Sequence, residues 1–427
     1  MNKSIINTIL CLIFSIVTIF EIVTGLFQLF GWIPSRHILF KMTGTLNNPG
    51  PYGGLLAILL SILISSVILD KQSRLVNGLA ILSILLGVVV LPSTRSRAAI
   101  LSLAIALFFL LKRETDLLSL LKSKKLIGIS TVTISCVALL ILFYAKKDSA
   151  LGRLHIWKIE TIALSKNPIS GSGPNTVLGT YGVTQAEYFR EKNRSAQSVR
   201  IAGCPEYAFN EYLKIGIERG IPVMLLSIFL IITLINLLLK YKICLGYGII
   251  AFSVFSFFSY PIEALTEKET SIEFQQAKNF IHSGLYNEAI QILEPLYDDN
   301  KKDYKYLYNL GYALHKEGRF EESNIILLQG AKYSSDPMFH NIIGKNYEAL
   351  NDFETARKEY IFSHYMVPSR IYPLYLLMRM ETKIGRDDQA IDIGKTIMEM
   401  PYNTSHQAMV NIRMERAHLL DSLKQSR

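Results

Sequence analysis

The stretch IPVMLLSIFLIITLINLLL, residues 221–239, contains no charged side chain. An α-helix rises 1.5 Å per residue, so about 20 apolar residues in a row span the ~30 Å hydrocarbon core of a bilayer. Similar apolar blocks recur from Ile5 to Tyr260. The sequence therefore predicts an all-α, polytopic transmembrane bundle with about seven spans, at 5–29, 52–69, 75–92, 97–111, 126–144, 221–239 and 243–260.

The charged residues indicate how these spans are oriented. The net charge is +10, but the basic residues cluster at the ends of apolar blocks and in one long loop rather than along one stripe, which argues against nucleic-acid binding. With a cytoplasmic N-terminus, the basic residues of the short connections all fall on the cytoplasmic side. The loop at about 145–220 and everything after Tyr260 then lie on the opposite side. The connecting residues concerned are Lys71, Arg74, Lys112, Arg113, Lys122, Lys124, Lys125, Lys240 and Lys242.

The four cysteines argue against a disulfide framework or a metal centre. Cys11, Cys136 and Cys244 lie inside apolar blocks, and Cys204 is alone in the long loop. No carboxylate cluster with metal-ligand spacing accompanies them. We therefore expect neither a metal nor another cofactor.

After the last apolar block, a pattern recurs with a period of 33–34 residues. Turn-forming residues mark the middle of each copy, and a small residue follows five positions later. This resembles the tetratricopeptide repeat, and about four copies over 270–404 predict a stack of helix pairs, an α-solenoid. We expect a C-terminal helix or tail at 405–427, and the pattern does not identify the protein partner of the repeats. The turn residues are Gly284, Gly318, Asn351 and Gly385, and the small residues are Ala289, Ser323, Ala356 and Ala390.

Two segments of the membrane part are unusually polar. TGTLNNPGPYGG, residues 43–54, leads into the second span, and PSTRSRAA, residues 92–99, joins the third to the fourth. An arginine at membrane depth costs on the order of 2.5–3.5 kcal/mol on insertion scales. Arg95 and Arg97 are therefore either interfacial anchors of a span or a guanidinium pair that binds a phosphate, whose oxygens suit the planar arginine fork.

The long loop carries a second set of polar motifs. Arg153, His155 and Trp157 begin an amphipathic stretch, and NPISGSGPN at 167–175 follows as a turn-rich element. Its glycines Gly171 and Gly173 could offer backbone N–H groups to an anion. A basic patch comes next, and the loop ends in NEYL at 210–213 and ERG at 218–220. The basic patch consists of Arg190, Lys192, Arg194 and Arg200.

In this order, the motifs resemble the superfamily of O-antigen ligases, O-antigen polymerases and bacterial protein O-oligosaccharyltransferases over about 40–260. The resemblance implies a bacterial inner-membrane protein whose loop and repeats are periplasmic. Such proteins transfer a glycan from a polyprenyl-pyrophosphate carrier in the membrane to lipid A core, a growing polymer or a protein hydroxyl. It further implies that Arg95 or Arg97, together with Arg153, holds the pyrophosphate, and that Asn210 and Tyr212 belong to the motif before the next span.

The sequence departs from the family at two points. Phe209 occupies the position where ligases typically have a histidine, the proposed base, and a phenyl ring cannot accept a proton. His155, Glu206 and Glu211 are the nearby replacements. The alternative roles are that His155 only packs beside Trp157 and that Glu211 caps a helix or pairs with Lys214. In addition, only one span precedes the Asn-Pro pair, where the family has several.

Three functions are consistent with these observations. The first is a metal-independent, inverting glycan transferase that uses lipid A core or a protein hydroxyl as acceptor. The second is a polymerase, which differs from the first only in its acceptor. The third is a non-catalytic membrane scaffold that binds a protein partner through its repeats, which Phe209 and the short N-terminal half favour.

Overall fold

The computed structural model describes residues 3–37, 39–70, 72–114, 147–191, 195–266 and 271–400. Every regular element in these ranges is a helix. They form two compact units. Unit 1 contains the described residues of Met1–Ala150, Tyr207–Gly216 and Ile221–Glu267, and unit 2 contains those of Leu151–Glu206, Ile217–Gly220 and Lys268–Arg427.

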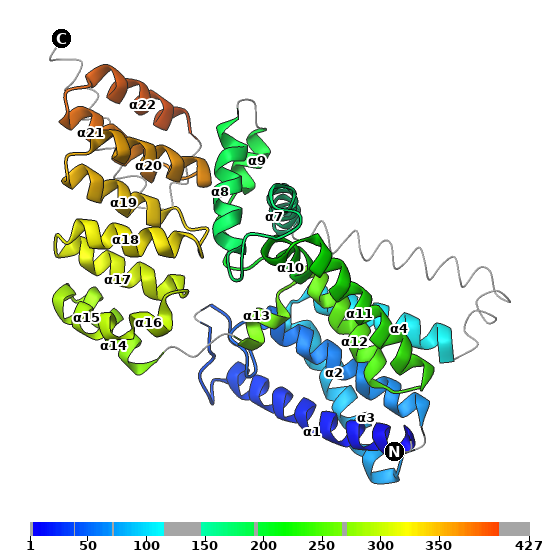
Figure 1. The fold of residues 1–427 in the computed structure, drawn as a ribbon. Helices are drawn as coiled ribbons and strands as arrows, with labels where there is room; N and C mark the ends of the chain where they lie inside the picture. Colours follow the sequence, from blue (N-terminus) through cyan, green and yellow to red (C-terminus); the bar gives the residue numbers. More distant parts are fainter. Residues whose placement is uncertain are drawn as a thin grey trace. The chain divides into compact units, whose positions relative to one another are not determined.

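Unit 1 is a bundle of apolar helices (Figure 1). Four of the described helical segments, beginning at Ser4, Pro49, Arg74 and Ile221, are long and apolar enough to cross a membrane, and α12 is a shorter apolar helix. The predicted span at 126–144 lies outside the described residues, so the count of seven stays a prediction. The helices of the bundle are α1 (Lys3–Phe30), α2 (Pro49–Leu69), α3 (Arg74–Val90), η1 (Leu91–Thr94), α4 (Arg97–Glu114), α11 (Ile221–Lys240), α12 (Leu245–Phe258) and the short α13 (Pro261–Thr266).

Helix α2 is the centre of this bundle and contacts α1, α3, α4, α12 and α13. Glycines allow these close approaches, because a Cβ on Gly54 would overlap the ring of Phe255 and one on Gly248 would overlap Ile62. Small residues at helix contacts are typical of membrane bundles, where backbone proximity replaces the hydrophobic effect between helices. Helix α11, in contrast, leaves large apolar side chains such as Phe229 exposed, as expected of a face that meets lipid.

Side-chain hydrogen bonds join several helices at one end of unit 1. The Asn7 side chain accepts from the backbone N–H of Cys244 (3.0 Å) and donates to the carbonyl of Lys242 (3.0 Å). At the same end, Arg113 donates to the carbonyl of Leu239 (3.1 Å). These bonds hold together the ends of α1, α4 and α11, the ends at which the sequence places its topology-setting charges.

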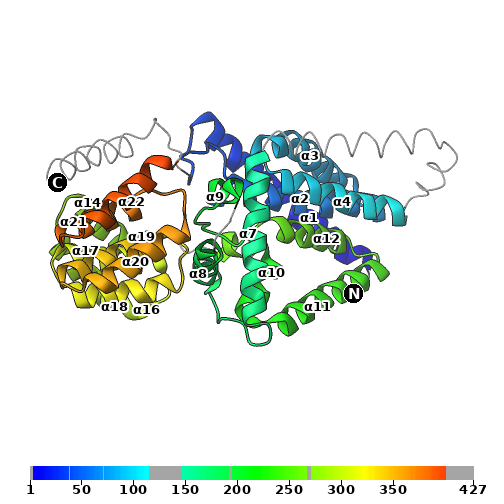
Figure 2. The ribbon, with the colours of Figure 1, turned by 90° about the horizontal axis from the view of Figure 1, so that it is seen from above.

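Unit 2 combines the long loop with the C-terminal helices (Figure 2). Three loop helices precede four consecutive helix pairs, and α10 (Glu211–Arg219) runs from unit 1 into unit 2. The loop helices are α7 (Lys147–Lys166), α8 (Val177–Arg190) and α9 (Ala196–Ile201). The pairs are α14 (Ile272–His282) with α15 (Tyr286–Leu293), α17 (Tyr304–Lys316) with α18 (Phe320–Ala331), α19 (Met338–Ala349) with α20 (Phe353–Met366), and α21 (Tyr372–Lys383) with α22 (Asp387–Glu399); η2 (Glu294–Leu296) and α16 (Tyr297–Asn300) follow the first pair.

The turns within the pairs fall where the period places them. Gly284, Gly318, Asn351 and Gly385 all have left-handed backbones, with φ of 78°, 78°, 63° and 73°. A left-handed residue after a helix end satisfies its last carbonyls, and glycine adopts this conformation without steric cost. The helix pairing is therefore observed. The assignment of these pairs to the tetratricopeptide class stays a prediction, and the predicted tail at 405–427 lies outside the described residues.

Unit 2 should lose stability in mild acid. Burial in α20 lowers the pKa of His364 from 6.5 to about 4. Because the folded form binds fewer protons at His364 than the unfolded form, folding is not penalised at this residue above pH 6.5, and stability is lost as the pH falls toward 4. We expect lowering the pH from 7 to 5 to cost about 2 kcal/mol at this site. Thermal unfolding at both pH values tests this, and His364→Leu should remove most of the difference; an unchanged difference in His364→Leu would contradict it.

Candidate functional site

The first polar segment is held in place by two buried side chains of α1. Gln28 accepts from the N–H groups of Thr43 and Gly44 (both 2.8 Å) and donates to the carbonyl of Gly44 (2.8 Å). The Glu21 carboxylate accepts from the hydroxyl of Thr45 (2.6 Å) and its N–H (3.1 Å). These bonds satisfy backbone groups that a loop at a membrane boundary would otherwise leave unpaired.

This segment meets the second polar segment at the start of α2. Asn48 caps α2 by accepting from the N–H of Gly50 (2.9 Å). A Cβ on Gly53 would overlap the side chains of Thr94 and Ser96, so the backbone of α2 lies directly against them. The structure therefore brings together two polar segments that lie about 40 residues apart in the sequence.

The two arginines of the second segment differ in their environment. Arg95 is exposed and has a left-handed backbone (φ 53°) at the end of η1. Arg97 is half-buried and begins α4. A left-handed backbone is uncommon for a residue other than glycine and is often found where function constrains the chain. Unit 1 thus holds Arg95 at the boundary of an apolar bundle in a conformation that favours a functional interpretation.

Phe209 also has a left-handed backbone, as does Lys242 in the same unit. The φ of Phe209 is also 53°, and its ring meets the Tyr260 ring edge-on with centroids 5.3 Å apart. Tyr260 in turn stacks on Tyr207 at 3.7 Å. The left-handed residue turns the chain into α10, whose cap is Asn210: its side-chain oxygen accepts from the N–H groups of Tyr212 and Leu213 (both 3.0 Å). Asn210 therefore has a structural role as a helix cap.

Glu211 joins α10 to α13. Its carboxylate accepts from the N–H of Ile262 (2.8 Å), and Lys214 pairs with Glu263 beside it. The interpretation of Glu211 as the partner of Lys214 is thus replaced by a bond to the backbone of α13. Burial raises the pKa of the Glu211 carboxyl, because loss of hydration disfavours its charge more than the nearby Lys214 supports it. A carboxylate in such an environment is a better proton acceptor than one in water.

Unit 2 contains Arg153 and His155, both on α7. Arg153 is half-buried, whereas His155 is only 5% exposed. Nε2 of His155 lies 2.9 Å from Oε1 of Gln185, and the imidazole ring is near the rings of Tyr188 and Phe189. Burial lowers the pKa of His155, so the imidazole is neutral at pH 7. Because Arg153 belongs to a different unit from Arg95 and Arg97, their joint binding of one pyrophosphate stays a prediction.

The glycine-rich turn does not offer its N–H groups to an anion. Gly171 donates to the carbonyl of Asn167 (3.1 Å), Ser172 to that of Ile217 (2.7 Å), and Gly173 to that of Glu218 (3.0 Å). Carbonyls in the last turn of a helix lack partners within it, so this turn caps the end of α10. The suggestion that Gly171 and Gly173 cradle an anion is therefore corrected, and they serve a structural contact instead.

The sequence did not single out three of these residues. Glu21 and Gln28 lie in an apolar span, where a buried polar side chain was a usable indication of function or loop support. Gln185 lies in the polar loop, where nothing distinguishes it locally. Among the residues that the structure describes, no group of three or more His, Cys, Asp or Glu side chains is placed to hold a metal ion.

Comparison with known proteins agrees with the motifs. Residues 82–228, which are 147 of the 427 residues, match the family model described as O-antigen ligase. No curated protein matches the chain. The matched range includes Arg95, Arg97, Arg153, the glycine-rich turn and the segment from Phe209 to Gly220, and it ends before the C-terminal helix pairs. The chain therefore carries an O-antigen ligase domain over residues 82–228.

Proposed function

We propose that this protein is a membrane glycan transferase that moves an oligosaccharide or polysaccharide from a polyprenyl-pyrophosphate carrier to lipid A core or to a protein hydroxyl. The family match over 82–228 carries this proposal. Apolar helices that suit a bilayer support access to a lipid-linked donor. The adjoining polar segments at the start of α2 and at η1 support a polar site at one boundary of the bundle. We place this boundary and unit 2 on the periplasmic face of the inner membrane.

In the proposed reaction, arginine side chains stabilise the leaving group. The acceptor oxygen attacks the anomeric carbon while the bond from that carbon to the pyrophosphate oxygen breaks, which inverts the anomeric centre. Negative charge then grows on the pyrophosphate. Arg95, Arg97 and Arg153 would bind it, because guanidinium groups form paired hydrogen bonds to phosphate oxygens.

We assign the base to Glu211 rather than to His155. Oε1 of Gln185 can only accept, so Nε2 of His155 carries a proton and donates it in that bond, which leaves Nδ1 as the one ring nitrogen able to accept a proton. Glu211 has a raised pKa, and its ionised form would take the proton of the acceptor hydroxyl. Its position beside the Phe209 turn, which replaces the usual histidine of the family, supports this role.

Glu211→Gln tests this assignment. A base acts in its deprotonated form, so wild-type transfer should rise with pH through the pKa of Glu211, which lies above its ordinary value of 4.5. The glutamine variant should be about 100-fold slower at neutral pH and lack that rise. Transfer rates across pH 4–8 provide the measurement, with Glu263→Gln as the neighbouring control. A glutamine variant that keeps the wild-type pH profile would exclude Glu211 as the base.

A non-catalytic scaffold is the second candidate. The observation that favours it is the aromatic cluster of Phe209, Tyr207 and Tyr260, which fills the position of the usual catalytic histidine with packed rings. A scaffold would keep the bundle and its helix pairs without transferring sugar. Purified protein supplied with a glycan-loaded carrier separates these functions: lipid A core and hydroxyl peptides as acceptors reveal a ligase, lengthening of the carrier-linked glycan reveals a polymerase, and no product indicates a scaffold.

A further inference from the structure

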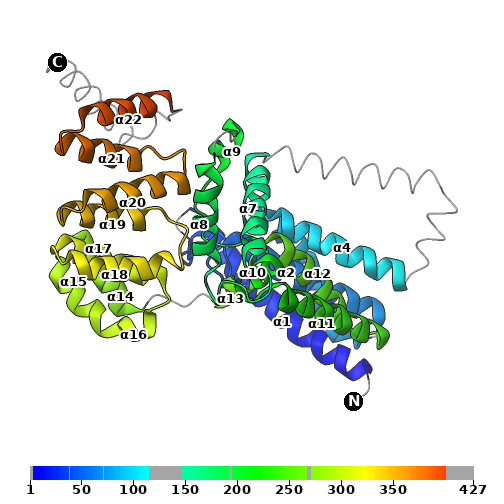
Figure 3. The same cartoon turned by 45° about the horizontal axis from the view of Figure 1, so that its top comes forward.

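Helix α8 of the loop packs directly against the third C-terminal helix pair (Figure 3). Gly179 and Gly182 lie three residues apart and so share one face of α8. A Cβ on Gly179 would overlap the backbone of Lys332, and one on Gly182 would overlap the side chain of Met366. The two glycines therefore allow the helix backbone to approach the repeats more closely than any other residue would.

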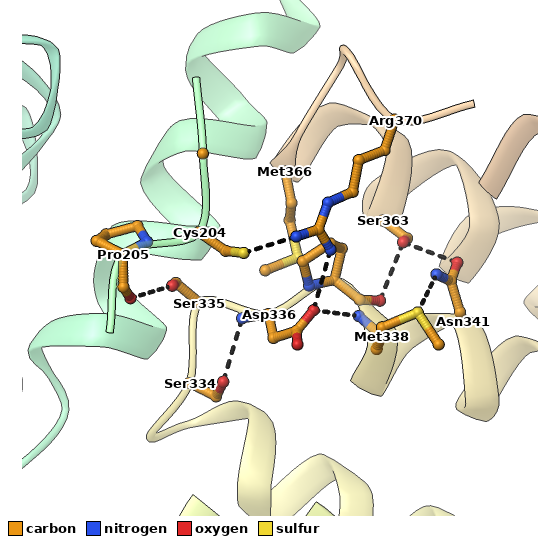
Figure 4. Close-up of polar contacts among 12 residues, drawn as sticks. Cys204, Pro205, Ser334, Ser335, Asp336, Met338, Asn341, Ser363, Met366 and Arg370 are labelled. Atoms are coloured by element: carbon orange, nitrogen blue, oxygen red, sulfur yellow. Dashed lines mark hydrogen bonds and ion pairs between the residues drawn. The ribbon is translucent and has the colours of Figure 1, made fainter. Parts of the chain in front are cut away.

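Polar contacts at the loop that follows extend this junction (Figure 4). Ser335 donates to the carbonyl of Pro205 (2.7 Å). Arg370 lies between the two segments: one guanidinium nitrogen is 2.9 Å from Sγ of Cys204, and another is 3.3 Å from Asp336. The loop and the repeats are thus joined by tight packing and by directed hydrogen bonds within unit 2.

Gln185, one helical turn beyond Gly182, connects this junction to α7. Its side chain is 1% exposed, and its amide makes four hydrogen bonds. The NH₂ group donates to the carbonyls of Met366 (2.5 Å) and Gly203 (2.9 Å), and the oxygen accepts from the hydroxyl of Tyr181 (2.6 Å) and from Nε2 of His155 (2.9 Å). Because carbonyls cannot donate, these partners fix the orientation of the amide.

This amide links the end of a repeat helix to the helix that carries a proposed pyrophosphate ligand. Met366 is the last residue of α20, where a carbonyl has no partner within the helix, and His155 lies two positions after Arg153 on α7. A fully satisfied buried polar group holds its neighbours in one arrangement, since any shift leaves a donor or acceptor unpaired.

We propose that Gln185 is a positioning residue through which the C-terminal helix pairs fix α7, and with it Arg153, for glycan transfer. The inference rests on the proposed function for its catalytic consequence. It assigns the third helix pair a part in the enzyme itself, in addition to any partner that the repeats bind.

Gln185→Met tests the proposal, because methionine has a similar length but makes none of the four hydrogen bonds. We expect hydrogen exchange of the α7 amides to become at least about tenfold faster while α17 and α18 keep their protection. We expect kcat/KM for transfer to fall roughly 10- to 100-fold. In a double-mutant cycle, Gln185→Met combined with Arg153→Ala should transfer no more slowly than Arg153→Ala alone, because one residue acts through the other.

Ser335→Ala is the matched control, since it removes a bond of the same junction that does not reach α7, and it should transfer like wild type. Unchanged α7 exchange in Gln185→Met, or independent, multiplying losses in the double variant, would overturn the proposal. If Gln185→Met loses protection throughout unit 2, Tyr181→Phe replaces it, because it removes a single donor to the Gln185 amide. The same exchange and transfer measurements then decide the proposal. Hydrogen exchange needs no substrate, so an inactive wild type would refute the proposed function without deciding the coupling of α7 to the repeats.

Discussion

Arg153→Ala should reduce glycan transfer by on the order of 100- to 1,000-fold, the loss typical of removing one group that stabilises charge in a transition state. The negative charge on the departing pyrophosphate grows as the glycosidic bond breaks. The substitution should therefore lower mainly the rate at which the enzyme–carrier complex reacts, and should change the affinity for the carrier less. Single-turnover rates and carrier binding, both measured in liposomes, separate the two quantities.

Two further variants make this expectation specific to Arg153. Arg190→Ala removes an exposed arginine from the last turn of α8 in the same unit and should transfer at the wild-type rate. Arg153→Lys keeps the charge but not the paired hydrogen bonds of the guanidinium, so it should recover only part of the loss. If Arg153→Ala transfers glycan as fast as Arg190→Ala, Arg153 is not part of the site and the scaffold function is favoured.

Gly171→Ala should destabilise unit 2 by about 2–5 kcal/mol, from about 1–2 kcal/mol for a left-handed alanine and about 1–3 kcal/mol for overpacking. Gly171 has a φ of 69°, and a Cβ there would collide with the backbone of Glu218, which cannot rotate away as a side chain can. The unfolding temperature should fall on the order of 5–15 °C in calorimetry of the detergent-solubilised protein.

Gly152→Ala is the paired control, because Gly152 lies inside α7 with nothing within 4 Å of its added Cβ. Alanine there should leave stability unchanged or raise it by up to about 1 kcal/mol. If Gly171→Ala unfolds at the same temperature as Gly152→Ala, the capping of α10 by the glycine-rich turn is wrong. If it folds normally but loses transfer, the anion-binding interpretation of the turn returns.

Local sequence patterns predicted the helices and their turns well. The spacing of Gly284, Gly318, Asn351 and Gly385 predicted four turns because a helix end imposes a local requirement that its own residues reveal, and all four residues have left-handed backbones. The apolar blocks likewise predicted the helices of unit 1, since bilayer thickness sets their length. In both cases the determining physics acts within about 20 residues.

Long-range contacts explain what the sequence did not reveal. Gly171 and Gly173 were consistent with an anion site until the carbonyls of Ile217 and Glu218, about 45 residues later, provided acceptors for this turn. Gln185 has no local signature because three of its four hydrogen-bond partners, His155, Gly203 and Met366, come from other segments. Glu211 was a plausible partner of Lys214, but its carboxylate accepts from the backbone of α13, 51 residues later in the sequence.

The most direct test of the enzyme is the release of polyprenyl pyrophosphate. Purified wild-type protein in liposomes would receive the glycan-loaded carrier together with lipid A core and hydroxyl peptides, and the freed carrier would be quantified by mass spectrometry. A transferase and a polymerase both break the bond to pyrophosphate, so we predict release that depends on the protein and on Arg153. If hydrogen exchange shows that the wild-type protein is folded and it still releases no carrier, the enzymatic account is contradicted.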